Sequence, residues 1–128
     1  MKKLGGKEIK NNIAVFISGR GSNLRSIIKY SNKKKFLYKV ELVISNNQNA
    51  KGLLLAKKKG IKNYSIDFTK SKKLCDVVLK ILKKNHIRLI CLAGFMKILP
   101  AYFIKSFFKK PILFILILFL LKIFLTIE

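Results

Sequence analysis

The sequence predicts an α/β domain built on an open, mostly parallel sheet with helices on both faces. Largely apolar runs at residues 13–17, 40–45 and 87–93 are typical of strands buried on both faces of such a sheet. Segments with apolar residues at helical spacing lie between these runs. Because strand and helix alternate along the chain, the strands are expected to run parallel within one domain.

The first apolar run ends in a turn that contains two glycines. Gly19 and Gly21 allow the backbone to turn sharply, and Ser22 is expected to cap a helix whose buried side carries Leu24, Ile27 and Ile28. A helix that starts at the carboxyl end of a strand offers free N–H groups and a positive dipole end to a phosphate. The spacing fits neither a P-loop nor a Rossmann fingerprint, so plain packing remains the alternative to an anion site.

The other elements follow in order. The polar run NNQN at residues 46–49 ends the second strand, and a short helix over residues 50–59 stops at Gly60, where a left-handed cap is expected. Residues 63–66 form a short third strand. A longer helix begins at Ser71 and buries one face, made of Leu74, Val77, Val78, Ile81 and Leu82. The strand at residues 87–93 ends at Gly94.

The composition restricts the class of protein. Hydrophobic residues make up 51% of the 128 residues, which argues against disorder. The formal charge of +23 comes from lysines scattered over every segment, and only Arg20, Arg25 and Arg88 are arginines. Lysine, asparagine, isoleucine and phenylalanine have A- and T-rich codons, so the base composition of the gene explains why lysine is abundant. The lysines are then expected to form a solvated surface. A specific nucleic-acid partner is therefore not expected, because arginine forks and interleaved aromatics are not evident.

Cys75, Cys91 and His86 are isolated from one another in the sequence. The two cysteines form no metal-binding spacing, so no metal is expected, and buried thiols in a reducing cytoplasm fit the pattern. Residues 1–12 are polar and do not resemble a secretion signal. His86 is expected at a helix end rather than in a catalytic role.

The loops that follow the strands are expected to meet at one edge of the sheet. These loops are residues 18–23, 45–47 and 94–99, and ligands of open α/β sheets bind at such an edge. His86 is expected at the opposite edge.

Two of these loops carry family motifs. The strings ISGRGSNL at residues 17–24 and LAGFMKIL at residues 92–99 resemble the paired signatures of the phosphoribosylglycinamide formyltransferases, which are folate-dependent enzymes of purine biosynthesis. The strings VISN at 43–46 and AKG at 50–52, with Ala56, Gly60 and Ile61, also follow the family pattern. The similarity covers about residues 13–107 and implies a truncated formyltransferase, Rossmann-like fold.

The resemblance also implies a reaction and its binding residues. The family transfers a formyl group from 10-formyltetrahydrofolate, its co-substrate, to glycinamide ribonucleotide. The family's phosphate-binding loop is matched by Gly21, Ser22 and Asn23, and its folate pocket by Met96, Lys97, Ile98 and Leu99. Lys72 falls near a basic residue that approaches the folate in the family. A membrane partner is not expected.

The sequence departs from the family after residue 110. Leu113 and Ile115 stand where the family has the catalytic Asn and His, and the position of a later catalytic Asp lies beyond Glu128, so no catalytic residue is assigned. Leucine and isoleucine can neither donate a hydrogen bond nor titrate. The chain therefore divides into a formyltransferase domain at residues 1–110 and an apolar tail at residues 111–128.

The tail has three interpretations. A change of reading frame near residues 109–110 would replace the family's continuation. A membrane anchor is the second, although the apolar run is only about half of the roughly 20 residues that span a bilayer. A buried strand is the third.

Three functions remain open on this basis. The first is formyl transfer, impaired by the missing catalytic segment. The others are a non-catalytic protein that binds the nucleotide or folate, and a basic protein of the membrane surface.

Overall fold

One sheet of five parallel strands organises the molecule. The computed structural model describes residues 3–4, 7–8, 10–107 and 114–117. The strand order is β5-β4-β3-β6-β7, and all four pairings are parallel. The strands are β3 (Asn11–Ile17), β4 (Tyr38–Ser45), β5 (Lys62–Ser65), β6 (Ile87–Leu92) and β7 (Phe114–Ile117). A separate antiparallel pair, β1 (Lys3–Leu4) and β2 (Lys7–Glu8), precedes the sheet.

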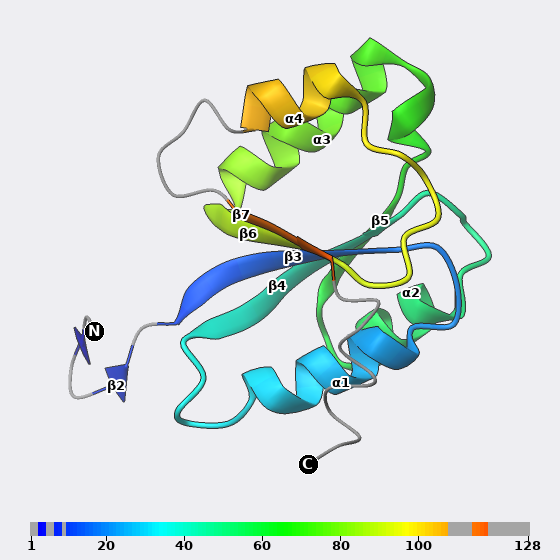
Figure 1. Ribbon diagram of the computed structural model, residues 1–128. Coiled ribbons are helices and arrows are strands. Elements are labelled where there is room, and N and C mark those ends of the chain that lie inside the picture. The colour runs from blue at the N-terminus through cyan, green and yellow to red at the C-terminus, as the bar shows by residue number, and fades with distance from the viewer. Residues whose placement is uncertain (1–2, 5–6, 9, 108–113, 118–128) are drawn as a thin grey trace.

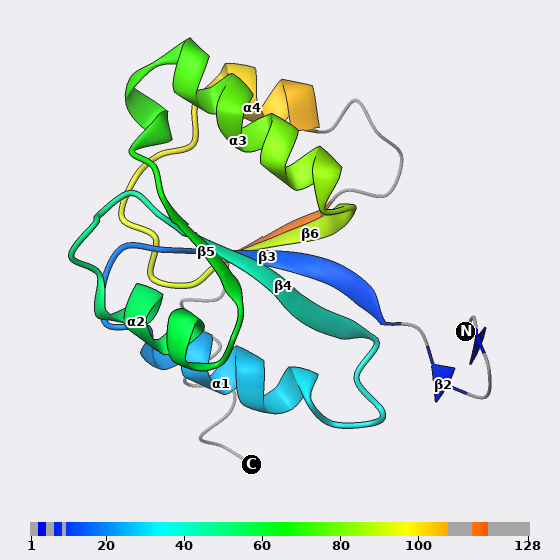
Figure 2. The same cartoon turned by 180° about the vertical axis from the view of Figure 1, so that it is seen from behind.

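Helices cover both faces of this sheet, as predicted. Figures 1 and 2 show α1 (Ser22–Ser31) and α2 (Lys51–Lys58) on one face, and α3 (Lys72–Lys84) and α4 (Ala101–Phe107) on the other. A short 3-10 helix, η1 (Phe68–Lys70), leads into α3. The α/β fold class predicted from the sequence is confirmed.

The central strand β3 supplies both cores because its side chains alternate between the two faces. Ile13, Val15 and Ile17 pack with the buried residues of α1 and α2. Ala14 and Phe16 face α3 and α4. Residues 13–17 of β3 form an uninterrupted apolar run because both faces of the strand are covered there.

Most element boundaries lie within two residues of those predicted. The largest shifts are in β3 and β4, which begin at Asn11 and Tyr38 rather than at residues 13 and 40, because the two strands already pair through Asn11 and Tyr38. Ser71 caps α3, and its Oγ accepts a hydrogen bond of 3.1 Å from the amide of Leu74. Gly60 has a φ of +71° after α2, which confirms the expected left-handed cap. The short elements η1 and α4 were not predicted.

Part of the apolar tail forms a strand. β7 pairs with β6 in parallel, and Ile115 lies opposite Ile90. Leu113 and residues 118–128 lie outside the described residues, so the reading-frame and membrane-anchor interpretations stay hypotheses. Within the described ranges, none of the helices is both long and apolar enough to span a bilayer.

Candidate functional site

Ser18 joins three loops at the carboxyl edge of the sheet. It follows β3 directly, and its hydroxyl donates a hydrogen bond of 2.5 Å to Asn46 Oδ1, just after β4. The same oxygen accepts a hydrogen bond of 2.7 Å from the amide of Met96, in the loop after β6. The structure therefore brings residues 18–23, 45–47 and 94–99 to one edge, as the sequence predicts.

The loop after β3 ends in the first turn of α1. Gly21 flanks the helix with a φ of +80°, and Ser22 is its first residue, with no side-chain hydrogen bond capping the helix. The prediction that Ser22 caps α1 is therefore wrong, because the left-handed glycine already precedes the first helical residue. The ladder begins where the amide of Arg25 donates to the carbonyl of Gly21, at 2.9 Å. The amides of Ser22 and Asn23 precede that bond and have no acceptor within the part of the chain that the structure describes.

A second helix begins beside this turn. A Cβ atom added to Gly21 would lie 2.7 Å from the Cα of Gly52, the second residue of α2. The amide of Gly52 donates a hydrogen bond of 3.1 Å to the carbonyl of Gly19. The positive dipole ends of α1 and α2 therefore meet at the predicted phosphate loop.

The charges around this edge favour an anion. Neither α1 nor α2 has an acidic residue in its first turn. Arg20 and Arg25 are exposed on either side of the Gly21–Asn23 turn. Asp67, after β5, is paired with Lys70 at 3.0 Å, so its charge is partly compensated. This potential suits a phosphate group at the amino end of α1.

The segment at residues 95–99 presents its middle to solvent. Phe95 packs against Phe16 and Phe68, with ring centroids 5.7 and 5.9 Å apart, and Leu99 is 8% exposed in the core. Met96 and Ile98 are 81% and 91% exposed, and Lys97 is exposed with them. Exposed apolar side chains that lie close together in one segment are a candidate binding surface. The family pattern assigns Leu99 to the folate pocket, but its side chain is buried and anchors the segment instead of facing outward.

Lys72 lies apart from the phosphate loop. It is the first residue of α3, and its Nζ is 4.7 Å from the ring centroid of Tyr102 on α4. The hydroxyl of Tyr102 donates to Asp76 Oδ1 at 2.5 Å. That hydrogen bond, together with burial and the charge of Asp76, raises the pKa of Tyr102. Lys72 therefore belongs to a contact between α3 and α4.

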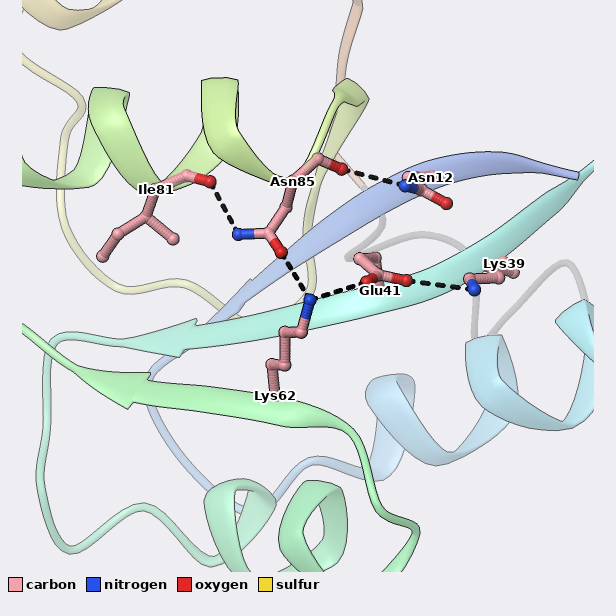
Figure 3. Close-up of polar contacts among 6 residues, drawn as sticks. All are labelled: Asn12, Lys39, Glu41, Lys62, Ile81 and Asn85. Carbon is pink, nitrogen blue, oxygen red and sulfur yellow. Dashed lines mark hydrogen bonds and ion pairs between the residues drawn. The ribbon is translucent and has the colours of Figure 1, made fainter.

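A polar cluster lies at the opposite edge of the sheet (Figure 3). Lys62 donates to Glu41 Oε1 at 3.0 Å and to Asn85 Oδ1 at 2.7 Å, and Lys39 lies 3.1 Å from Glu41 Oε2. Asn85 binds Ile81 and Asn12 through two further hydrogen bonds. The cluster borders a hollow of about 430 Å³. His86 follows Asn85 directly, at the edge and helix end where the sequence placed it.

The groups of this cluster stabilise one another. Burial acts to raise the pKa of the Glu41 carboxyl, but the hydrogen bonds and charges of Lys62 and Lys39 outweigh it and hold that pKa below its usual value. The C-terminal ends of α1 and α2 also line the hollow. The negative ends of two helices disfavour an anion there, so the carboxyl edge remains the candidate site.

The cysteines behave as buried apolar groups. Both are free and buried, and burial raises the pKa of Cys91 to about 12. Burial and the charge of Asp76 raise the pKa of Cys75. Across the part of the chain that the structure describes, no three His, Cys, Asp or Glu side chains group so as to hold a metal ion.

Four residues of this edge were missed as site residues. Ser18 and Asn46 connect the loops, Gly52 receives the turn at Gly21, and Phe95 anchors the exposed segment. All four lie in the strings that follow the family pattern. Their roles depend on contacts between distant segments, which spacing along the chain does not reveal.

Comparison with known proteins agrees with this arrangement. The formyl transferase family matches residues 11–115. A phosphoribosylglycinamide formyltransferase of Dictyostelium discoideum is 39% identical over 107 residues, which cover 75% of this chain and 52% of that protein.

Solved structures agree as well. The phosphoribosylglycinamide formyltransferase of Anaplasma phagocytophilum is 35% identical with a TM-score of 0.68, covering 75% of this chain and 45% of that one. The Brucella melitensis enzyme is 30% identical with a TM-score of 0.72, covering 81% and 55%. This chain thus spans about half the length of these three proteins. The match over residues 11–115 shows that the chain belongs to the formyl transferase family.

Proposed function

We propose that this chain binds glycinamide ribonucleotide and 10-formyltetrahydrofolate as part of a phosphoribosylglycinamide formyltransferase of purine biosynthesis. The observation that carries the proposal is the Ser18 hydroxyl, which holds the phosphate loop and the 95–99 segment at one edge of the sheet. Formyl transfer needs its two substrates side by side, and adjacent binding segments meet that need. A cytoplasmic enzyme with reduced, buried thiols is part of the proposal.

The ribonucleotide phosphate is assigned to the first turn of α1. Gly21 provides the turn, and the amides of Ser22 and Asn23 precede the helical ladder. The adjacent start of α2 adds a second positive dipole end. Neither helix has an acidic residue in its first turn that would repel a phosphate.

The folate is assigned to the segment at residues 96–99. Met96 and Ile98 supply exposed apolar surface for a flat ring, and Lys97 adds a charge beside them. Leu99 fixes the end of the segment in the core. The Nζ of Lys72 lies over the ring of Tyr102, at the contact between α3 and α4. Lys72 therefore contacts the folate only if the folate extends to that contact.

The groups that would assist proton transfer are replaced in this sequence. Attack of an amine on a formyl carbon needs a hydrogen-bond donor for the developing oxyanion and a group that moves the proton. Leu113 and Ile115 stand at the family's Asn and His positions and supply neither. Binding without turnover is therefore the second candidate function.

A charge placed at the first turn of α1 tests the binding site. Ser22→Glu is expected to lower the affinity for glycinamide ribonucleotide at least tenfold in calorimetric titration, because the carboxylate repels the phosphate. An acidic residue at a helix start also favours the helix, so lost binding is not explained by unfolding. Ser26→Glu, one turn further along α1, is the matched control. Equal affinity of both variants would refute the phosphate assignment.

Turnover separates the two candidate functions. With both substrates bound, formyl transfer at a rate above that of a no-protein control supports the enzyme. Ribonucleotide binding with no transfer supports the non-catalytic protein.

A further inference from the structure

The hydroxyl group of Ser18 has a single proton, and its neighbours decide which of them receives it. A serine hydroxyl donates one hydrogen bond and accepts others. The amide of Met96 can only donate, so the Ser18 oxygen must be its acceptor, at 2.7 Å. The remaining partner of the hydroxyl is the side chain of Asn46, at 2.5 Å. The single proton of Ser18 is therefore given to Asn46.

This assignment fixes the orientation of the Asn46 amide. Its Oδ1 faces Ser18, since the reversed amide would leave the hydroxyl proton without an acceptor among the residues that the structure describes. The Nδ2 group is then turned away from Ser18, and it has no acceptor among the residues that the structure describes. Asn46 is only half-buried, so its two N–H donors are available to a ligand.

The position of Asn46 matches the proposed site. It follows β4, the neighbour of β3 in the sheet, and is bonded to the residue that begins the phosphate loop. The next residue, Asn47, strengthens the same junction, because its Nδ2 donates to the carbonyl of Ser18 at 3.3 Å. Asn46 is thus fixed through its Oδ1, while its Nδ2 has no partner among the described residues.

We propose that Asn46 is a ligand-binding residue, whose amide donates to an oxygen of the ribonucleotide, and that Ser18 is the positioning residue that orients it. The proposal rests on the proposed function, because it takes the ligand from there. It adds a side-chain contact from the loop after β4 to a site otherwise built from the loops after β3 and β6 and the start of α2.

Asn46→Asp separates the donor from the junction. The aspartate keeps an oxygen for the Ser18 proton but loses both N–H donors. Glycinamide ribonucleotide is expected to bind at least tenfold more weakly, with an unchanged thermal midpoint. Asn49→Asp adds the same charge to the same loop at an exposed position and serves as the control. If Asn46→Asp binds the ribonucleotide as tightly as Asn49→Asp does, the proposal is overturned.

A spectroscopic measurement tests the role of Ser18. In the wild type, the side-chain ¹⁵N–¹H resonances of Asn46 are expected to shift when glycinamide ribonucleotide is added. Ser18→Ala should abolish that shift, and Ser18→Thr should restore it, because threonine keeps the hydroxyl. A purely structural role for Ser18 predicts instead that the Asn46 resonances respond equally in the alanine variant, which would overturn the positioning role.

The wild-type titration distinguishes the two levels of failure. A wild-type chain that does not bind glycinamide ribonucleotide overturns the proposed function, and this inference with it. Tight wild-type binding combined with equal affinities of Asn46→Asp and Asn49→Asp overturns the inference alone.

Discussion

Gly21 and Gly52 touch through their backbones, and a Cβ atom on Gly21 would lie 2.7 Å from the Cα of Gly52. Real Cβ atoms do not approach another carbon this closely, so a side chain at Gly21 would force α1 and α2 apart. Gly21 also has a φ of +80°, which disfavours any other residue. The contact sets the distance between the two helix starts that form the candidate phosphate site.

Three glycine-to-alanine variants separate these two costs. Gly21→Ala is expected to lower the free energy of unfolding by about 3 kcal/mol, because it combines strain with a clash. Gly60→Ala should cost about 1 kcal/mol, since Gly60 has a φ of +71° but open space around its Cα. Gly19 has neither feature, so Gly19→Ala should change stability by less than about 0.5 kcal/mol. Urea unfolding measures all three.

The order of the three variants is the critical result. Equal losses at Gly21 and Gly60 would mean that helix α2 yields to the new methyl group, and that the Gly21–Gly52 contact does not fix the site. A large side chain at Gly21 is accordingly a poor probe of phosphate binding, because it reports on folding as well.

Two serines at helix starts differ in their capping role. Ser71→Ala should destabilise the protein by about 1 kcal/mol, because the Ser71 hydroxyl accepts the Leu74 amide at 3.1 Å. Ser22→Ala should change stability by less than about 0.5 kcal/mol, since the side chain of Ser22 makes no capping hydrogen bond. Thermal unfolding of both variants checks this difference. A larger loss for Ser22→Ala would show that its hydroxyl does cap α1.

The buried thiols are expected to be unreactive in the folded chain. Burial raises the pKa of Cys91 to about 12, so at pH 8 only about one molecule in ten thousand carries its thiolate. The Sγ of Cys75 contacts the carbonyl of Phe68 at 3.2 Å, and its pKa is raised by burial and by Asp76. Labelling with a thiol reagent should proceed only after unfolding in urea. Cys75→Ala and Cys91→Ala variants assign each thiol, and rapid labelling of the native chain at either one contradicts the prediction.

The sequence predicts the sheet and its main helices because strong local patterns specify them. Residues 13–17 are apolar on both faces, and they lie between two helical layers as that pattern indicates. The helix starting after Ser71 has both a cap and an apolar face at helical spacing. The seven-residue α4 was missed because it is too short for a clear periodicity, and Phe103 and Phe107 make it stable only through packing.

The candidate site is only partly visible in the sequence. The strand ends locate the edge, and the family motifs select Gly21–Asn23 and residues 96–99. The junction at Ser18 and the contact at Gly52 join residues about 30 or more apart in the chain, at Ser18–Asn46, Ser18–Met96 and Gly21–Gly52. Such contacts follow from the register of the sheet, which only the folded structure gives. The capping role predicted for Ser22 failed because the left-handed Gly21 takes its place.

The ion pairs at the opposite edge make stability depend on pH. Hydrogen bonds and charges from Lys62 and Lys39 overcome the effect of burial and hold the pKa of Glu41 below its usual value. A carboxyl whose pKa is lower in the folded state stabilises that state when ionised. This stabilisation is fully present at a pH above the pKa that Glu41 has in the unfolded chain. It is lost as the pH falls through the lower pKa that Glu41 has in the folded chain.

Glu41→Gln removes this contribution. At pH 7 the free energy of unfolding of the variant is expected to be about 1 kcal/mol lower than that of the wild type. The reason is that Lys62 and Lys39 lose a charged partner whose side chain is only 17% exposed. The difference should shrink as the pH falls through the lowered pKa of Glu41, because the carboxyl then becomes protonated in the wild type as well. Urea unfolding between pH 3 and pH 7 gives the free energy of unfolding of both proteins as a function of pH. Lys62→Met should reduce the pH-dependent part of that free energy, because it removes one partner of Glu41. Lys80→Met, on the exposed side of α3, should leave it unchanged. A wild-type-to-Gln difference that is constant across this range would show that Glu41 does not stabilise the fold through its charge.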